Sequence, residues 1–208
     1  MNINRKQLRL ALTALALLLN QVSYANDLQQ SDQKEAFMEQ NIVTLKGSPV
    51  RISGSLPRLG IQAQDFVLID KDLKKRSLKD YSGKRKLISI VPSLDTAVCS
   101  LSAKKFNQAI KENPQEGVVL NVSADLPFAQ SRFCHAEEVD NIICLSTMGS
   151  KDFSEGYGIL MLDGPLANLC ARAIVVLDEN DTVIYTELVP EITQEPNYDK
   201  ALEHFFKK

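Results

Sequence analysis

Short apolar segments, rich in Val, Ile and Leu, recur along the chain and are separated by segments with helical periodicity. Six of them are predicted strands: 65–70 (DFVLID), 86–93 (KLISIVPS), 117–125 (GVVLNVSAD), 141–147 (NIICLST), 171–180 (ARAIVVLDEN) and 181–189 (DTVIYTELV). Several are almost continuously apolar, which indicates strands that are buried on both faces. A chain of 208 residues, 44% of them hydrophobic, can bury one core of ordinary size, so we expect a single globular domain.

The segments between the strands supply four helix candidates, at 97–112, 126–139, 151–159 and 197–208. The first stops at Asn113 and Pro114. Its apolar side chains are expected on one face, formed by Val98, Leu101, Phe106, Ala109 and Ile110. The second has Pro127 close to the first-turn position where proline is tolerated, after Asp125 or Leu126 at the cap.

Two turn signals complete the pattern. The stretch IVTLKGSPVRI predicts a hairpin around Gly47 and Ser48, and DEND, at 178–181, predicts a tight turn that closes an antiparallel pair. The order of elements is that of an α/β fold, with a mixed central sheet, helices on both faces and an N-terminal β-hairpin.

The N-terminal 25 residues have the features of a secretory signal peptide. Arg5, Lys6 and Arg9 precede the apolar run LALTALALLL, and small residues follow at Ser23 and Ala25. The apolar run is about half as long as a membrane span requires, which disfavours the alternatives of an uncleaved anchor or a buried helix. We therefore predict cleavage after Ala25, a polar arm at 26–41, one domain at 42–208, and export, with the periplasm as the expected compartment.

Charge excludes two classes of partner. Cleavage would remove three basic residues and no acidic ones, which takes the formal net charge from −2 to −5. A modestly acidic protein offers no electrostatic basis for binding nucleic acid or anionic membranes, so neither is expected as a partner. In an exported chain the four cysteines, Cys99, Cys134, Cys144 and Cys170, allow two disulfides in three pairings, and their spacing does not choose among them.

Cys99 has the sequence context of a reactive thiol. If Thr96 caps the helix that starts at residue 97, Cys99 lies in the first turn, where free N–H groups and the helix dipole favour an anion. Thiolate is the nucleophilic form of cysteine, and such positions lower its pKa. Pro92 bends the chain over the site and shields it from water, and the Thr96 hydroxyl can hydrogen-bond the sulfur or a substrate oxygen. These features are typical of nucleophilic attack by sulfur on a small polar molecule.

The same residues carry a resemblance to a known family. Pro92, Thr96 and Cys99 match the P-x-x-x-T-x-x-C signature of peroxiredoxins. Flanking blocks resemble the thiol peroxidase branch, the atypical two-cysteine peroxiredoxins: FVLIDKDL, GKRKLISIVPSLDTAVCS, KFNQ, SADLPFAQSRFC, GPLANLCARAIVVLDEND and EITQEPNYDKAL. The resemblance covers residues 42–205 and implies a thioredoxin-like fold.

The resemblance also implies a role for each site residue. Cys99 would attack the peroxide and become a sulfenic acid, with Thr96 orienting the reactants and Arg172 polarising the peroxide and holding the thiolate. Cys134 would be the resolving cysteine, which forms an intramolecular disulfide with Cys99 that a thioredoxin-like dithiol donor reduces. The substrates would be hydrogen peroxide and organic hydroperoxides, and the family implies a homodimer that pairs near the active site.

No metal, haem or flavin is required by this chemistry, and two histidines without a CxxC pair give too few zinc ligands. Cys144, on an expected edge strand, and Cys170 depart from the family pattern. The strand order of the family would place two strands between them, too far for a disulfide, so both are predicted to be core thiols. A thioredoxin-fold redox sensor or binding protein without turnover is the alternative function. A disulfide oxidoreductase is disfavoured because it would use CxxC spacing.

Overall fold

The computed structural model describes residues 41–114 and 117–206. The predicted signal peptide and residues 26–40 of the predicted arm lie outside the described residues. Asn41, the last residue of that arm, is buried, and its backbone carbonyl accepts a hydrogen bond from Ile52. None of the described helices is long and apolar enough to cross a membrane.

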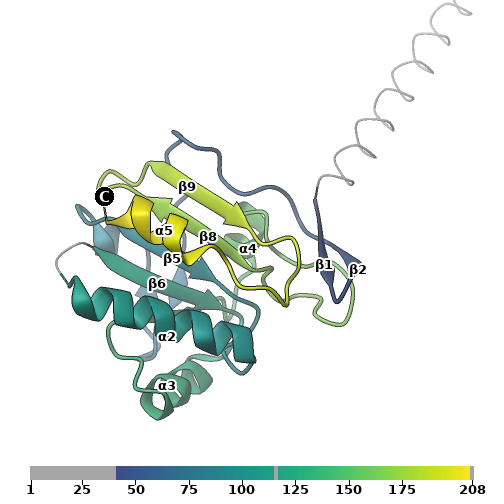
Figure 1. Cartoon of the computed structure of the whole chain (residues 1–208), viewed down its shortest axis with the longest axis horizontal. Coiled ribbons are helices and arrows are strands. Elements are labelled where there is room, and N and C mark those ends of the chain that lie inside the picture. Colours follow the sequence, from purple (N-terminus) through teal and green to yellow (C-terminus); the bar gives the residue numbers. More distant parts are fainter. Residues whose placement is uncertain (1–40, 115–116, 207–208) are drawn as a thin grey trace, which may run out of the picture. The chain divides into compact units, whose positions relative to one another are not determined.

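The described domain is built on one mixed sheet of seven strands (Figure 1). The strands are β3 (Leu68–Ile69), β4 (Lys75–Arg76), β5 (Lys86–Ile90), β6 (Val118–Ser123), β7 (Ile143–Ser146), β8 (Ala173–Leu177) and β9 (Val183–Leu188). Their order is β4-β3-β7-β6-β5-β8-β9, with β5, β6 and β7 parallel and the remaining pairs antiparallel. The α/β prediction with a mixed central sheet is confirmed, as is the antiparallel pair closed by the turn at 178–181.

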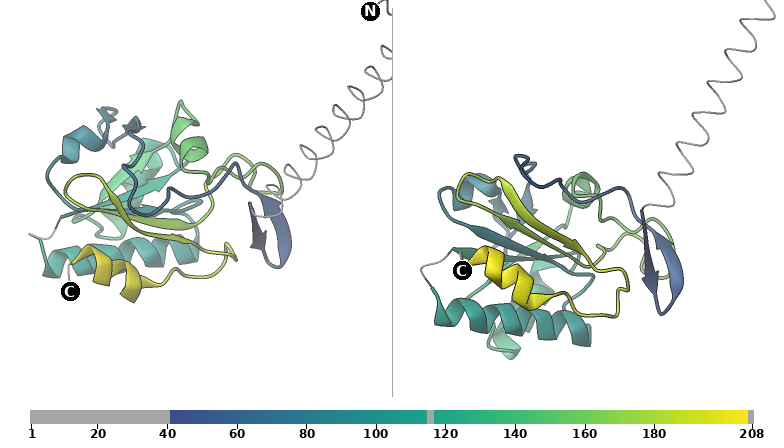
Figure 2. Two further views of the ribbon diagram at one scale, coloured as in Figure 1. Left: turned by 90° about the horizontal axis from the view of Figure 1, so that it is seen from above. Right: turned by 45° about the horizontal axis from the view of Figure 1, so that its top comes forward.

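Helices cover both faces of the sheet (Figure 2). On one face α2 (Ala97–Glu112), α3 (Pro127–Ala136) and α5 (Tyr198–Phe205) bury Phe106, Phe133 and Phe205 against the sheet. On the other face a 3-10 turn, η1 (Leu78–Tyr81), and the short helix α4 (Asp152–Gly156) pack over a second core cluster.

Strand periodicity assigns each side chain to one of these faces. Because successive side chains of a strand alternate, Leu87 of β5 and Cys144 of β7 lie on the face covered by α2, α3 and α5, whereas Ile88 and Leu145 lie on the opposite face. Contacts between α3 and β7 place that helix above Cys144.

The N-terminal hairpin forms a separate two-stranded sheet from β1 (Ile42–Leu45) and β2 (Ser48–Arg51). Its turn residues are Lys46 and Gly47, both with positive φ, so the turn lies one residue earlier than predicted. The hairpin is joined to the loop after β9, because the N–H of Thr44 donates to Pro190 and the N–H of Ile192 donates to Thr44.

Several element predictions need correction. Strand β7 is not an edge strand, because the two-residue strands β3 and β4 extend the sheet beyond it. Helix α2 has the predicted bounds, but its buried stripe is Cys99, Ser102, Ala103, Phe106, Asn107 and Ile110, with Leu101 exposed and Ala109 half-buried. Helix α3 ends at Ala136 with Leu126 as its N-cap, and the fourth turn of the predicted segment is not helical.

Candidate active site

The first turn of α2 presents Cys99 at the end of the loop that leaves β5. Thr96 is the N-cap, in extended conformation, and its carbonyl accepts from the N–H of Ser100, so Cys99 is the third helical residue, as predicted. Cys99 is 0% exposed, whereas Thr96 is exposed. The Thr96 hydroxyl lies 2.8 Å from the Cys99 sulfur and 3.0 Å from the carbonyl oxygen of Ser93. The hydroxyl has one proton, so it can donate a hydrogen bond either to the Cys99 sulfur or to the Ser93 carbonyl oxygen.

Arg172 approaches the same sulfur from the neighbouring strand. It immediately precedes β8, whose first residue, Ala173, is the register partner of Ile90 at the end of β5. Its Nη2 lies 3.4 Å from the Cys99 sulfur, and both Nε and Nη2 donate to the carbonyl oxygen of Ile192, each at 3.1 Å. The guanidinium is buried, and its Nη1 has no hydrogen-bond partner among the described residues. A cation with a free donor thus faces the thiol.

Two further features fix the loop before Cys99. Pro92 is buried at the end of β5. Asp125, which follows β6, accepts from the Ser93 hydroxyl and from the N–H of Leu94, both at 2.7 Å. The sequence predicts only a possible helix cap at Asp125. Asp125 follows β6, which is parallel to β5 and adjacent to it. Because parallel strands end at the same edge of the sheet, this position indicates that Asp125 lies near the loop before Cys99.

A polar network on the same helix joins α2 to α5, and the sequence reasoning did not identify it. The Ser102 and Tyr198 hydroxyls lie 2.7 Å apart, and Lys105 makes an ion pair with Glu195 at 2.8 Å. The Lys105 ammonium also lies 4.2 Å from the centre of the Tyr198 ring. Hydrogen bonding to Lys105 lowers the pKa of Glu195, and burial raises the pKa of Tyr198 to about 12. This network packs the C-terminal helix against the helix that carries Cys99.

Cys134 does not contact Cys99. It lies in the last turn of α3, half-buried, with its sulfur 3.1 Å from the sulfur of Cys144 on β7. All four cysteines are free thiols. The contact with Cys144 lowers the pKa of Cys134, and the same contact together with burial raises the pKa of Cys144 well above its ordinary value. The prediction of Cys144 as only a core thiol is therefore incomplete, since it is buried but paired with Cys134.

Cys170 is a core thiol, as predicted. It is 1% exposed and packs in the cluster on the opposite face of the sheet from Cys144, and burial raises its pKa to about 12. Strands β6 and β5 lie between β7 and β8, which agrees with the predicted separation of Cys144 and Cys170.

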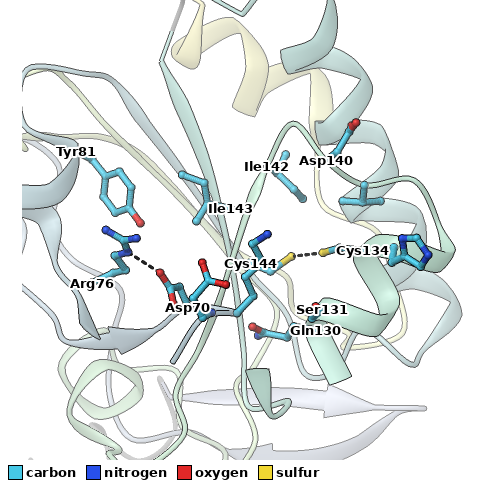
Figure 3. A pocket seen from close by; sticks show the side chains of 14 residues that line it. Asp70, Arg76, Tyr81, Gln130, Ser131, Cys134, Asp140, Ile142, Ile143 and Cys144 are labelled. Carbon is cyan, nitrogen blue, oxygen red and sulfur yellow. Dashed lines mark hydrogen bonds and ion pairs between the residues drawn. The ribbon is translucent and has the colours of Figure 1, made fainter. Parts of the chain in front are cut away.

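A cavity adjoins Cys134 and Cys144, and Cys99, Thr96 and Arg172 are not among its lining residues (Figure 3). Its volume is about 760 Å³, and its wall includes Lys71, Arg76, Gln130, His135 and Ile142 beside the two thiols. Among the described residues no group of three or more His, Cys, Asp or Glu side chains could hold a metal ion.

Comparison with known proteins places the chain in a family. Residues 58–202 match the Redoxin family model. A thiol peroxidase of Leptospira interrogans serovar copenhageni is 50% identical over 163 residues, which cover 77% of this chain and 94% of that protein.

Solved structures show the same fold. A peroxiredoxin-like protein from Aquifex aeolicus aligns with a TM-score of 0.72 and 40% identity, over 79% of this chain and 97% of that one. A thiol peroxidase from Chromobacterium violaceum also aligns with a TM-score of 0.72, at 24% identity, over 78% and 93% of the two chains. The predicted thioredoxin-like fold is confirmed, and the chain belongs to the redoxin family, in the thiol peroxidase branch of the peroxiredoxins.

Proposed function

We propose that this protein is a thiol-dependent peroxidase that reduces hydrogen peroxide and organic hydroperoxides with Cys99 as the attacking sulfur. The observation that carries the proposal is the contact of one buried sulfur with both a hydroxyl and a guanidinium, at 2.8 and 3.4 Å. The arginine supports the thiolate by charge, and its free Nη1 is available to a peroxide oxygen. The exposed Thr96 marks the side from which a hydroperoxide reaches the sulfur.

The chemistry divides into two steps. Attack of the Cys99 thiolate on the terminal oxygen breaks the O–O bond, forms a sulfenic acid and releases the alcohol or water. The Cys134 thiol then displaces hydroxide from that sulfur, which gives a Cys99–Cys134 disulfide and water. A thioredoxin-like dithiol donor reduces the disulfide by exchange and becomes oxidised itself.

Formation of the Cys99–Cys134 disulfide requires movement. In the thiol state the Cys99 sulfur contacts Thr96 and Arg172, and the Cys134 sulfur contacts Cys144. We expect local unfolding of the first turn of α2, of the end of α3, or of both, because a disulfide needs sulfurs about 2 Å apart. Hydrogen exchange that is equally slow in these turns before and after oxidation would contradict this expectation.

The proposal includes assembly into a homodimer, which the family implies, and export, for which the N-terminal segment is the evidence. The basic and apolar N-terminal segment supports cleavage after Ala25 and a periplasmic site of action. There the donor would be a thioredoxin-like protein supplied with electrons from across the membrane. N-terminal sequencing of the protein recovered from periplasm checks this, and a chain that keeps Met1 in the cytoplasmic fraction would contradict it.

The test of function starts from the fully reduced protein. One equivalent of cumene hydroperoxide should remove two of the four thiols, and the first linkage found by peptide mass spectrometry should join Cys99 and Cys134. Cys99→Ser should abolish hydroperoxide consumption, whereas Cys134→Ser should allow one equivalent to react and then stop at the sulfenic acid. Four unchanged thiols in the wild-type protein would refute the peroxidase, and single-event oxidation without turnover by a dithiol would favour a redox sensor.

A further inference from the structure

A second pair of thiols lies in contact outside the site around Cys99. The sulfurs of Cys134 and Cys144 are 3.1 Å apart, and a disulfide is about 2.05 Å long, so closing this bond needs a shift of about 1 Å. The contact follows from the fold. Cys144 occupies the helix-facing side of β7, and α3 returns across that strand with Cys134 in its last turn. A Cys134–Cys144 disulfide is therefore compatible with the folded helix, whereas the Cys99 sulfur contacts Thr96 and Arg172 instead of Cys134.

We propose that Cys144 acts as a second resolving cysteine, which receives the disulfide from Cys99 and Cys134. The inference rests on the proposed peroxidase function. Cys144 gives its proton to solvent, its thiolate attacks the Cys134 sulfur of the Cys99–Cys134 disulfide, the old S–S bond breaks, and Cys99 leaves as a thiolate. The products are a Cys134–Cys144 disulfide and reduced Cys99, with no change in the number of electrons.

The folded structure favours this direction of exchange. When Cys134 pairs with Cys144, the last turn of α3 regains the position it has in the thiol state, and Cys99 returns to Thr96 and Arg172. The free energy spent on unfolding local turns is thereby recovered. The released sulfur is also the one that the Arg172 guanidinium stabilises as an anion, which makes Cys99 the better leaving group.

A buried amide beside Cys144 is suited to assist the attack. Asn121 of β6 is the register partner of Cys144, so the two side chains lie on the same face of the sheet. Asn121 is 0% exposed, and neither its amide nitrogen nor its oxygen has a hydrogen-bond partner among the described residues. An unpartnered N–H donor next to a buried sulfur would stabilise a thiolate there, which burial otherwise disfavours.

The exchange also moves the disulfide to where a reductant can reach it. Cys99 is 0% exposed, whereas Cys134 and Cys144 line the cavity of about 760 Å³ (Figure 3). A dithiol donor would attack Cys134 from this cavity. That attack forms a mixed disulfide between the donor and Cys134 and releases Cys144 as the thiolate. The second thiol of the donor then breaks the mixed disulfide and releases Cys134, whose thiolate is stabilised by the positive charge of Lys71 in the cavity wall.

The experiment follows the linkages through time in the purified wild-type protein. Fully reduced protein receives one equivalent of hydrogen peroxide without any reductant, and aliquots are quenched in acid and digested unreduced. The expected sequence is a Cys99–Cys134 peptide first, then its replacement by Cys134–Cys144 with Cys99 again a free thiol. A second addition should then be consumed, so the protein takes up about two equivalents, and Cys144→Ala should take up about one. The matched control, Cys170→Ala, removes another buried thiol and should behave as wild type.

Each other outcome has a defined meaning. If Cys99–Cys134 forms and persists in the wild-type protein, the relay is wrong and the peroxidase proposal stands. If Cys134–Cys144 forms equally fast in Cys99→Ser, the pair is oxidised directly and the relay is again wrong. If no hydroperoxide is consumed and no linkage forms, the peroxidase proposal falls and the relay falls with it. The wild-type time course decides these cases even if Cys144→Ala folds poorly.

Discussion

The Thr96 hydroxyl, 2.8 Å from the Cys99 sulfur, is a single group whose removal tests the geometry of the site. Thr96→Val keeps the shape of the side chain and removes the donor, whereas Thr96→Ser keeps the donor. We expect Thr96→Val to lower the second-order rate constant with hydrogen peroxide roughly 100-fold, the usual effect of losing one preorganised donor at a reacting centre. Thr96→Ser should stay within about threefold of wild type on the same grounds. A competition assay measures both, and wild-type speed in Thr96→Val would remove this hydroxyl from the mechanism.

The thiol of Cys134 offers a second test at this scale, through its pKa. Contact with Cys144 lowers that pKa, so Cys144→Ala should move it upward toward the ordinary value. Alkylation proceeds through the thiolate, and its midpoint at Cys134 should therefore shift to higher pH in the variant. Peptide-resolved iodoacetamide labelling across pH gives the midpoint, with Cys170→Ala as the control. An unchanged midpoint would mean that the two sulfurs do not share a proton in solution.

Local sequence signals predicted the bounds of α2 but not its buried face. The bounds of α2 followed from Thr96 and from the Asn113-Pro114 stop, both of which act locally. Its buried face did not follow, because polar Ser102 and Asn107 are buried through partners on distant segments, Tyr198 and Asn141. Such partners depend on tertiary packing. The pairing of Cys134 with Cys144 was missed for the same reason, since it requires α3 to return over β7.

Glu191 connects two elements that sequence reasoning treated separately, the N-terminal hairpin and the loop that holds Arg172. Its carboxylate accepts from the Thr193 hydroxyl, the N–H groups of Gly47 and Lys46, and the Thr44 hydroxyl. These bonds lower the pKa of Glu191 well below its ordinary value of 4.5. The next residue, Ile192, accepts both bonds from Arg172. Glu191 is therefore a positioning residue for the Arg172 guanidinium. It acts through Ile192, which binds Arg172, which in turn contacts the Cys99 sulfur.

Glu191→Gln should weaken this connection, with a Tm lower by roughly 2 °C at neutral pH and slower peroxide reduction. The sign of the pH dependence follows from the depressed pKa. Stability from Glu191 is present above pH 4.5 and is lost as pH falls through the lower folded-state value, so the two proteins should converge in acid. Thermal melts between neutral and acid pH measure the difference. The control is Glu203→Gln on the exposed face of α5, and an equal loss in that variant would contradict a specific role for Glu191.

For the whole molecule, the strand order implied by the family resemblance was the most informative expectation. It separated Cys144 from Cys170 by two strands, which the order β7-β6-β5-β8 confirms. Apolar runs indicate where strands lie but not how they are ordered, so this order was available only through the resemblance to the family. Sequence gave no view of the cavity beside Cys134 and Cys144. That cavity is lined by residues of the β3–β4 segment, η1, α3 and β7, which are distant in sequence, and the two-residue strands β3 and β4 carry little periodicity.

Association of two copies is the remaining expectation at this scale. Leu126, the N-cap of α3, and Phe128, in its first turn, are 53% and 62% exposed and lie shortly after Asp125, which holds the loop before Cys99. An apolar pair this close to the site suits a partner surface, and a second copy of the chain is the partner implied by the family. Phe128→Glu would place a charge in that interface. Light scattering should then show a dimer for wild type and a monomer for the variant.

Leu59→Glu is the matched control for this prediction, because Leu59 is 63% exposed but precedes the strand pair β3–β4, away from the sequence of α3. It should remain dimeric. If both variants dissociate, general charge repulsion rather than the face near Cys99 explains the effect, and if neither does, the copies pair elsewhere. A dimer through α3 would also restrain the helix that must release Cys134. Phe128→Glu should therefore form the Cys99–Cys134 disulfide faster than wild type, and an unchanged rate would show that dimerisation and resolution are independent.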